Sequence, residues 1–203
     1  AVWLRVVGRL AFPLFSYCIA EGCRYTRNKV RYFGSVFACG AVCVIAFLPF
    51  GSFYGNALIT LSMSILLLYG VEAWKSSGKL RFLALTAALA AVFYLLCRTV
   101  YIDYGFAGVL LPVYAAAGRI LWERVFADIP PVIGERLGFA IGLLALAGVM
   151  GGVQRFCVLA IFPILLLGNE RGKWEMQHFF YIYYPAHLAL IGAMRMALEA
   201  AAG

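Results

Sequence analysis

Charged side chains are scarce in this chain, and their scarcity excludes an ordinary soluble domain. Only 13% of its 203 residues are charged, with 9 acidic residues against 17 basic ones, and 65% are hydrophobic. A soluble domain has about a quarter charged residues and roughly half apolar ones. The apolar excess extends over the whole length. The sequence therefore predicts an all-α, polytopic integral membrane bundle, a single domain over residues 1–203 that lies in the lipid bilayer.

Several signatures of soluble enzymes are also absent. The chain has no Walker phosphate loop, no dinucleotide-binding glycine motif after a strand, no GxSxG and no HExxH, which sets those chemistries aside. Its six cysteines lack metal-ligand spacing, so we expect them to be packing residues and expect no metal. The net charge of +8 does not indicate nucleic acid, because membrane topology accounts for the basic residues.

About eight apolar runs are candidate membrane spans. They are Val2–Gly22, Val30–Leu48, Asn56–Trp74, Leu80–Cys97, Phe106–Trp122, Leu137–Met150, Phe156–Leu167 and Phe179–Leu198. An untilted span needs about 20 residues, so we expect the sixth and seventh to be thin or re-entrant helices. Gly134, Gly138 and Gly142 recur every four residues, and Gly148 and Gly152 repeat that spacing. Such small residues predict close helix packing.

Basic residues gather in alternate connections, twelve in one set against two in the other. The basic set comprises residues 24–31, 74–81, 119–136 and 168–178, and the other set comprises residues 48–55, 98–105 and 150–155. Short loops rich in Lys and Arg stay in the cytoplasm. We therefore expect the basic set to face the cytoplasm and the other set to face outside.

The first span carries two charges in an apolar helix, Arg9 and Glu21, and we expect Pro13 to interrupt that helix. A charge in the bilayer interior costs at least about 2.5 kcal/mol, so it usually faces a partner or a wet cavity. Three turns, roughly 18 Å, separate the two residues, so they do not pair with each other. The sequence therefore predicts a polar cavity within the bundle, with other partners for each charge.

Histidine occurs only twice in the chain. His187 lies about two turns inside the last span, shortly after Pro185, which frees a backbone carbonyl one turn earlier. An imidazole there can insert while neutral and exchange a proton near pH 7. The alternative is a packed histidine that bonds a backbone carbonyl. His178 falls on a basic connection, where we expect a surface residue.

Two further features each have two interpretations. Asp103, at the outer membrane edge, either binds an ammonium group or forms a salt bridge with Arg98. The basic connection 24–31 either holds the phosphates of a cofactor or sets topology and contacts anionic lipids.

Several short blocks, in order along the chain, resemble the TraX family. They are Arg9–Phe15 followed by Ile19–Gly22 and Tyr25–Asn28, then Asn56–Leu61, Asp103–Gly105 with Gly108, and Tyr184–Leu188. Members of that family are membrane proteins linked to N-terminal acetylation of conjugative pilin subunits. They usually begin with a further helix that carries an Asp-His pair. We expect that this helix either lies upstream of Ala1 or is missing from this member of the family.

The resemblance implies an acetyltransferase of the bacterial inner membrane that uses cytoplasmic acetyl-CoA. His187 would be the general base or a transient acetyl acceptor, and Arg9 with Tyr183 or Tyr184 would stabilise the oxyanion. Asp103 would hold the ammonium group of the acceptor. The acceptor is either the amine of a pilin-like peptide or the hydroxyl of a surface glycan.

The phosphates of acetyl-CoA would bind to five basic residues, namely Arg24, Arg27, Lys29, Arg31 and Lys173. The competing interpretation is a non-enzymatic membrane protein, either a small transporter or an assembly partner of pilin. Its buried charges would then form a permeation path or structural ion pairs.

Overall fold

Apolar runs fold into helices throughout the part of the chain that the structure describes. This computed structural model describes residues 2–47, 55–126 and 128–166 and the single positions 186, 190, 194 and 196, with side chains described from residue 8 onward. The elements are α1 (Val2–Tyr25), α2 (Lys29–Phe47), α3 (Ala57–Ser77), α4 (Leu80–Thr99), α5 (Gly105–Val125), α6 (Pro131–Met150), the 3₁₀ helix η2 (Gly152–Ala160) and α7 (Ile161–Leu166). The all-helical fold class is therefore confirmed for these residues.

The predicted number of about eight spans is not confirmed. Among the described residues, α3, α4, α5 and α6 are the helices long and apolar enough to cross a membrane. The helices α1 and α2 have 24 and 19 residues and form where spans were predicted. The eighth predicted span, 179–198, falls almost entirely outside the described residues.

Two local predictions are wrong. The helix α1 is not interrupted at Pro13 but continues through it to Tyr25, and Pro13 itself is buried. Apolar helices tolerate proline where neighbouring helices shield the freed backbone groups. The sixth span is also not short, because α6 begins at Pro131 and has 20 residues. Its first turns include Glu135 and Arg136, and two adjacent charged residues are typical of a loop when only the sequence is considered.

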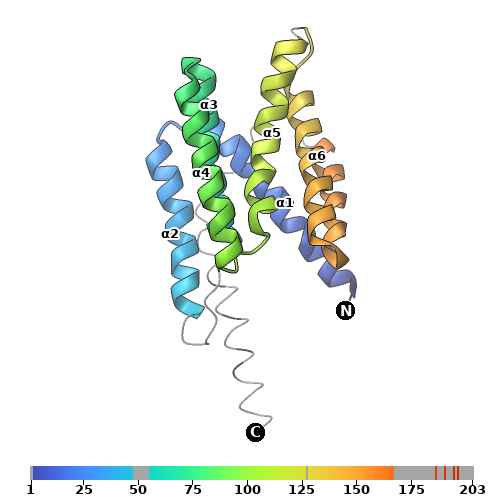
Figure 1. Ribbon diagram of the computed structural model, residues 1–203. Helices are drawn as coiled ribbons and strands as arrows, with labels where there is room; N and C mark the ends of the chain where they lie inside the picture. Colours follow the sequence, from blue (N-terminus) through green and yellow to red (C-terminus); the bar gives the residue numbers. More distant parts are fainter. Residues whose placement is uncertain are drawn as a thin grey trace.

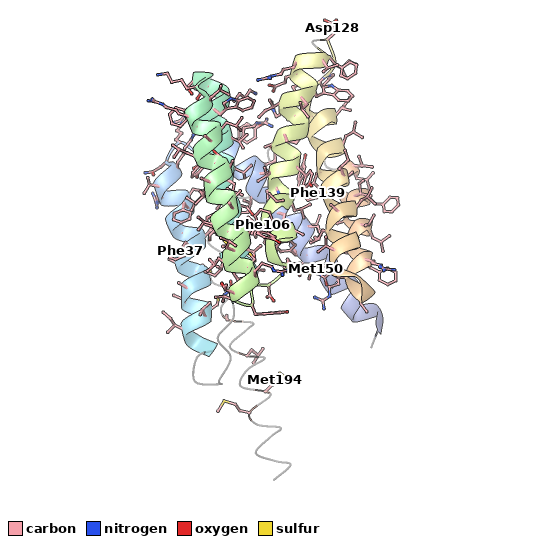
Figure 2. The ribbon with its side chains drawn as sticks, viewed as in Figure 1. Phe37, Phe106, Asp128, Phe139, Met150 and Met194 are labelled. Atoms are coloured by element: carbon pink, nitrogen blue, oxygen red, sulfur yellow. The ribbon has the colours of Figure 1, made fainter. Side chains whose placement is uncertain are left out.

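Successive helices run in alternating directions, so the bundle has two distinct ends (Figure 1). The connections after α1, α3 and α5 lie at one end, which we call the charged end. The connections after α4 and α6 lie at the other, and Figure 2 shows Asp128 and Met150 at these two ends. The charge alternation predicts the same grouping of connections. Which side of a membrane the charged end faces stays a prediction.

The closest contact in the bundle joins α5 to α6 through glycines. A Cβ atom added at Gly138 would come within 2.9 Å of the Cα of Gly118, and one at Gly134 would meet the Trp122 ring at 2.6 Å. Real Cβ atoms do not approach other atoms so closely, so only glycine fits here. The predicted packing role is thus confirmed for Gly134, Gly138 and Gly142, whereas Gly148 and Gly152 face open space.

The helix α4 covers one side of the bundle and leaves a wide apolar face uncovered. Only 11% of its most apolar window is buried, and Leu85, Val92 and Leu95 are all exposed. Large exposed apolar patches on a monomer indicate contact with lipid or a partner. Together with the length of the helix, this face fits the hydrocarbon of a bilayer.

Candidate functional site

The loop between α4 and α5 is held in one conformation by hydrogen bonds from α3 and the residues before it. The amide of Asp103 donates to the carbonyl of Gly55 over 2.7 Å, and the hydroxyl of Thr60 donates to the carbonyl of Asp103 over 2.5 Å. Asn56 caps α3 by accepting from two amides, and its side-chain amide donates to the carbonyl of Gly40 over 2.8 Å. The loop carrying Asp103 is therefore rigidly placed.

Tyr104 has an unusual backbone conformation in this loop. Its φ is +64°, and it is the only non-glycine residue with positive φ in the described part of the chain. Left-handed backbone costs a non-glycine residue of order 1 kcal/mol and tends to cluster at functional sites. The ring of Tyr104 stacks on Phe12 of α1 with 3.6 Å between centroids. Gly108 permits the contact, because a Cβ there would come within 3.1 Å of Phe12 and closer still to Tyr104.

Arg9 of α1 lies near Asp103 and acts on it electrostatically, without a direct ion pair between these two described side chains. Burial raises the pKa of the Asp103 carboxyl above its ordinary value, and the nearby Arg9 guanidinium offsets part of that increase. No ion pair joins Asp103 to Arg98 within the described chain, although the sequence allows that pairing. Arg9 therefore has the separate partner that its position in an apolar helix requires.

Gln154 of η2 completes this group. Its side chain is buried and, like that of Arg9, lies within hydrogen-bonding reach of the hydroxyl of Tyr104. Burial raises the pKa of Tyr104, and these two neighbours lower it by a smaller amount. Tyr104 therefore keeps its proton at neutral pH. We call the group of Arg9, Asp103, Tyr104 and Gln154 the Asp103 site.

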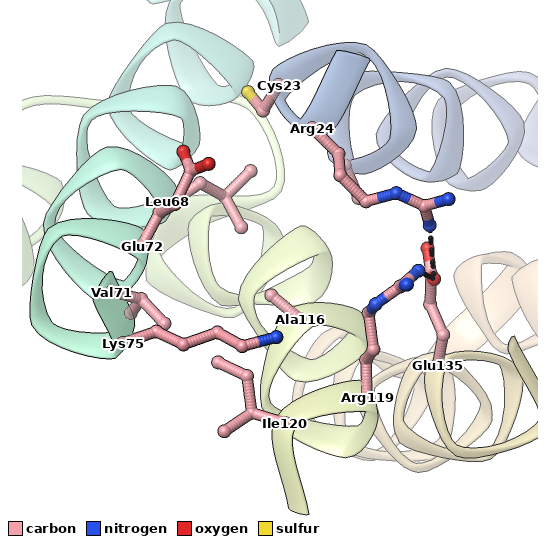
Figure 3. A pocket seen from close by; sticks show the side chains of 11 residues that line it. Cys23, Arg24, Leu68, Val71, Glu72, Lys75, Ala116, Arg119, Ile120 and Glu135 are labelled. Carbon is pink, nitrogen blue, oxygen red and sulfur yellow. Dashed lines mark hydrogen bonds and ion pairs between the residues drawn. The ribbon is translucent and has the colours of Figure 1, made fainter. Parts of the chain in front are cut away.

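A second polar group lies at the charged end, around Glu135 of α6. Glu135 is only 3% exposed and accepts hydrogen bonds from Arg24 of α1 over 3.3 Å and from Arg119 of α5 over 3.1 Å (Figure 3). Arg24 also pairs with Glu21 at 3.1 Å. A buried carboxylate is tolerated when charged partners of this kind surround it. Glu21 thus finds its partner here, at the end opposite to Arg9.

Further ion pairs extend this group to α2 and α3. Lys29 pairs with Glu72 at 2.7 Å, Arg119 pairs with Glu123 at 3.0 Å, and Lys75 also pairs with Glu123. The whole ion-pair cluster consists of Glu21, Arg24, Lys29, Glu72, Lys75, Arg119, Glu123 and Glu135. Four acids balance four bases, so the cluster as a whole is neutral and ties five helices together.

A pocket of about 130 Å³ opens beside the ion-pair cluster, between α1, α3, α5 and α6 (Figure 3). Its lining combines six uncharged, mostly apolar side chains with five charged ones. The lining residues are Ala20, Cys23, Leu68, Val71, Ala116 and Ile120 with Arg24, Glu72, Lys75, Arg119 and Glu135. Such a mixed lining suits an elongated ligand with a weakly polar arm and a charged head.

A packed layer separates the pocket from the Asp103 site. Leu111 and Ala115 of α5, with Phe139 and Leu143 of α6, are completely buried between the two polar ends. The fifteen residues from Arg9 to Arg24 correspond to roughly 22 Å along a helix. A ligand held at the charged end therefore has to cross this layer to reach the Asp103 site.

The structure describes four of the five predicted phosphate-binding residues and the predicted oxyanion residue Arg9 on α1, α2 and the connection between them. Arg24 and Lys29 are engaged in ion pairs, whereas Arg27 and Arg31 are exposed and have no ion pair among the described residues. Arg9 lies at the Asp103 site. His187, Tyr184, Tyr183 and Lys173 lie outside the described residues, so their predicted roles stay predictions.

Sequence reasoning missed three residues that the structure brings into these groups. Glu135 was missed because its segment resembled a loop, although a carboxylate among apolar neighbours is itself a signal. Gln154 is likewise a lone amide in a mainly apolar segment. Tyr104 stood in a family block but was assigned no role, and nothing local in the sequence reveals its left-handed backbone. No cluster of metal-binding side chains occurs among the described residues.

Comparison with known proteins decides the family. The profile of the TraX protein family matches residues 1–195, nearly the whole chain. The chain belongs to the TraX family. This TraX-family chain is also 28% identical over 220 residues to the probable fimbrial assembly protein FimC, serogroup H1, of Dichelobacter nodosus, with 97% of this chain and 84% of FimC covered. No solved structure matches it.

The family blocks noted in the sequence now have physical explanations in this TraX-family chain. Asn56 and Thr60 brace the loop that carries Asp103, and Gly108 makes room for Tyr104. Arg9 reaches the same loop from α1. Three blocks far apart in the sequence therefore meet at the Asp103 site.

Proposed function

We propose that this TraX-family protein transfers an acetyl group from acetyl-CoA to an amine at the Asp103 site. The observation that carries the proposal is the Asp103 site itself, where Arg9 of α1 lies near the carboxyl of Asp103, which a rigid loop holds at the end opposite to the basic connections. Two opposite charges placed near each other in an apolar bundle are costly, and intramembrane ionisable groups usually mark a functional site. Its two charges match the two ends of the reaction, an ammonium acceptor and a developing oxyanion.

The reaction would proceed by attack of the acceptor nitrogen on the thioester carbonyl carbon. Asp103 would bind the incoming ammonium group, and a base would remove its proton before attack. His187 is our candidate for that base, and Arg9 with Tyr184 would stabilise the oxyanion. The carbon–sulfur bond then breaks, and the CoA sulfur leaves as a thiolate that takes up a proton.

The donor would bind at the charged end, which we place in the cytoplasm of a bacterial inner membrane. Arg27 and Arg31 are the exposed cations best able to hold its phosphates, with Arg24, Lys29 and Lys173 as further partners. The pocket beside the ion-pair cluster would admit the acyl-bearing arm. Cysteine labelling in intact cells tests the orientation: position 103 should react without permeabilisation, and residues 27 and 31 should react only after it.

The acceptor we propose is the N-terminal amine of a pilus subunit. The name of the FimC relative, a fimbrial assembly protein, supports a pilus-related acceptor. An amine rather than a glycan hydroxyl is favoured because Asp103 offers a carboxylate, which binds an ammonium group but gains little from a neutral hydroxyl.

A second candidate, a non-enzymatic assembly partner of pilin, is supported by the printed name of FimC and by the neutrality of the ion-pair cluster. Paired charges stabilise a scaffold and need not bind a ligand. In that case the cluster would serve only to hold the helices together.

The deciding experiment uses purified protein in lipid nanodiscs, acetyl-CoA with an isotopically labelled acetyl group, and a pilin-like peptide with a free N-terminus. We expect labelled peptide from the native protein and none from a peptide whose N-terminus is blocked. Asp103→Asn should lower transfer, whereas Asp128→Asn, which changes an exposed aspartate at the charged end, should leave it unchanged. If the native protein labels no free peptide, the assembly-partner interpretation replaces the enzyme.

A further inference from the structure

The hydroxyl of Tyr104 lies beside two side chains that can donate hydrogen bonds to it. The side chains of Gln154 and Arg9 lie within hydrogen-bonding reach of its oxygen. A guanidinium has only donors, so Arg9 can meet the phenol only at its acceptor positions, and the amide N–H of Gln154 can donate to the same oxygen. In that arrangement the single O–H of Tyr104 is left to donate to a ligand, and accepting two hydrogen bonds strengthens it as a donor.

The position of that hydroxyl is fixed from three sides. The left-handed backbone of Tyr104 is held by the braced loop, with the amide of Gly108 donating to its carbonyl over 3.0 Å. The ring is stacked on Phe12 at 3.6 Å and nearly parallel to it. Gln154 secures the far end of the side chain. A donor that cannot rotate away is what stabilisation of a transition state requires, since no reorganisation is needed during the reaction.

We propose that Tyr104 is a catalytic residue that donates a hydrogen bond to the carbonyl oxygen of the transferred acetyl group, and that Gln154 is a positioning residue that acts through it. This inference rests on the proposed acetyl transfer and deepens it. As the acceptor nitrogen bonds to the carbonyl carbon, the C=O electron pair moves to oxygen and the Tyr104 O–H donates to it. When the carbon–sulfur bond breaks, the pair returns and the tyrosine keeps its proton.

The test compares kcat and KM for acetyl transfer in single and double variants. Removing one donor from such a site lowers kcat by about 10²- to 10³-fold, so Tyr104→Phe should lose that much while KM for both substrates changes little. Gln154→Leu should lower kcat by a smaller factor. The matched control is Tyr94→Phe, which removes the hydroxyl of an exposed tyrosine on α4 and should be silent.

The double variant separates a positioning role from a structural one. If Gln154 acts through Tyr104, adding Gln154→Leu to Tyr104→Phe should change kcat by less than about twofold, because the hydroxyl it positions is already gone. Independent contributions would multiply instead, and this would overturn the role of Gln154. Full kcat in Tyr104→Phe would overturn the role of Tyr104 while leaving the proposed transfer intact.

Thermal unfolding of the same variants keeps the result interpretable. A merely structural tyrosine would lower the unfolding temperature and kcat together, and this outcome would contradict a catalytic role. Absence of transfer by the native protein refutes the proposed function, and the inference falls with it. A native enzyme with an active Tyr104→Phe variant refutes the inference alone.

Discussion

The glycine contact between α5 and α6 makes a prediction that a matched pair of variants can isolate. Gly138→Ala would place a Cβ within 2.9 Å of the Cα of Gly118 and within 3.1 Å of its nitrogen, and closer still to the carbonyl of Tyr114. These are backbone atoms and cannot rotate away, so the two helices must separate. Overpacking of this kind costs about 1–3 kcal/mol.

The control is Gly148→Ala, in the same helix but facing open space. Both variants gain up to about 1 kcal/mol of helix propensity, so that gain largely cancels in the comparison. What remains is the clash, about 1–3 kcal/mol, which for a chain of this size corresponds to about 2–12 °C in the unfolding midpoint. We expect Gly148→Ala to unfold at the higher temperature by that margin in detergent. Equal midpoints would refute backbone-to-backbone packing of α5 and α6.

Three further predictions concern the charged groups. Glu135→Gln should lower the unfolding temperature by the equivalent of about 1–3 kcal/mol, because two guanidiniums lose their buried carboxylate; an unchanged temperature would show that the cluster is not structural. Since burial raises the pKa of Asp103, its carboxylate is protonated at a higher pH than an ordinary aspartate, and transfer should begin to fall at that higher pH. The folded protein should gain stability as the group is protonated. Asp103→Asn should remove that acid limb and unfold at the same or a higher temperature. His187→Ala should lower transfer 10²- to 10⁴-fold with His178→Ala nearly silent, and a loss under tenfold would assign the base elsewhere.

The helices of the middle of the chain could be predicted from sequence, because long apolar runs have few alternatives in a bilayer. The spans predicted at 56–74, 80–97 and 106–122 fall within α3, α4 and α5 to within a residue at their starts and a few at their ends. The start of α6 could not be predicted from sequence. Glu135 is stabilised there by Arg24 and Arg119, which lie on helices that approach it only in the folded protein. A charge whose partners come from distant segments resembles a loop residue when only its neighbours in the sequence are considered.

The Asp103 site could be predicted in part. Arg9 and Asp103 stood out because charges are rare in apolar segments, and the structure brings these two together. The contact between Tyr104 and Gln154 joins residues fifty positions apart, through a left-handed backbone that no local pattern reveals. Uncharged polar side chains are also common in the sequence, so a buried one such as Gln154 does not stand out until the structure is known.

The glycine seam between α5 and α6 has a consequence for the choice of acyl donor. The helix α5 begins directly after Tyr104 and carries Arg119, and α6 carries Glu135 and ends shortly before Gln154, so together they connect the two polar ends. Because backbone meets backbone at Gly118 and Gly138, the pair can neither slide nor part without loss of contact. If the donor is held at one end and reacts at the other, this rigid pair of helices fixes the distance that the donor has to span. The protein would then select donors by the length of the acyl-bearing arm, independently of how the protein surface fits the acetyl group.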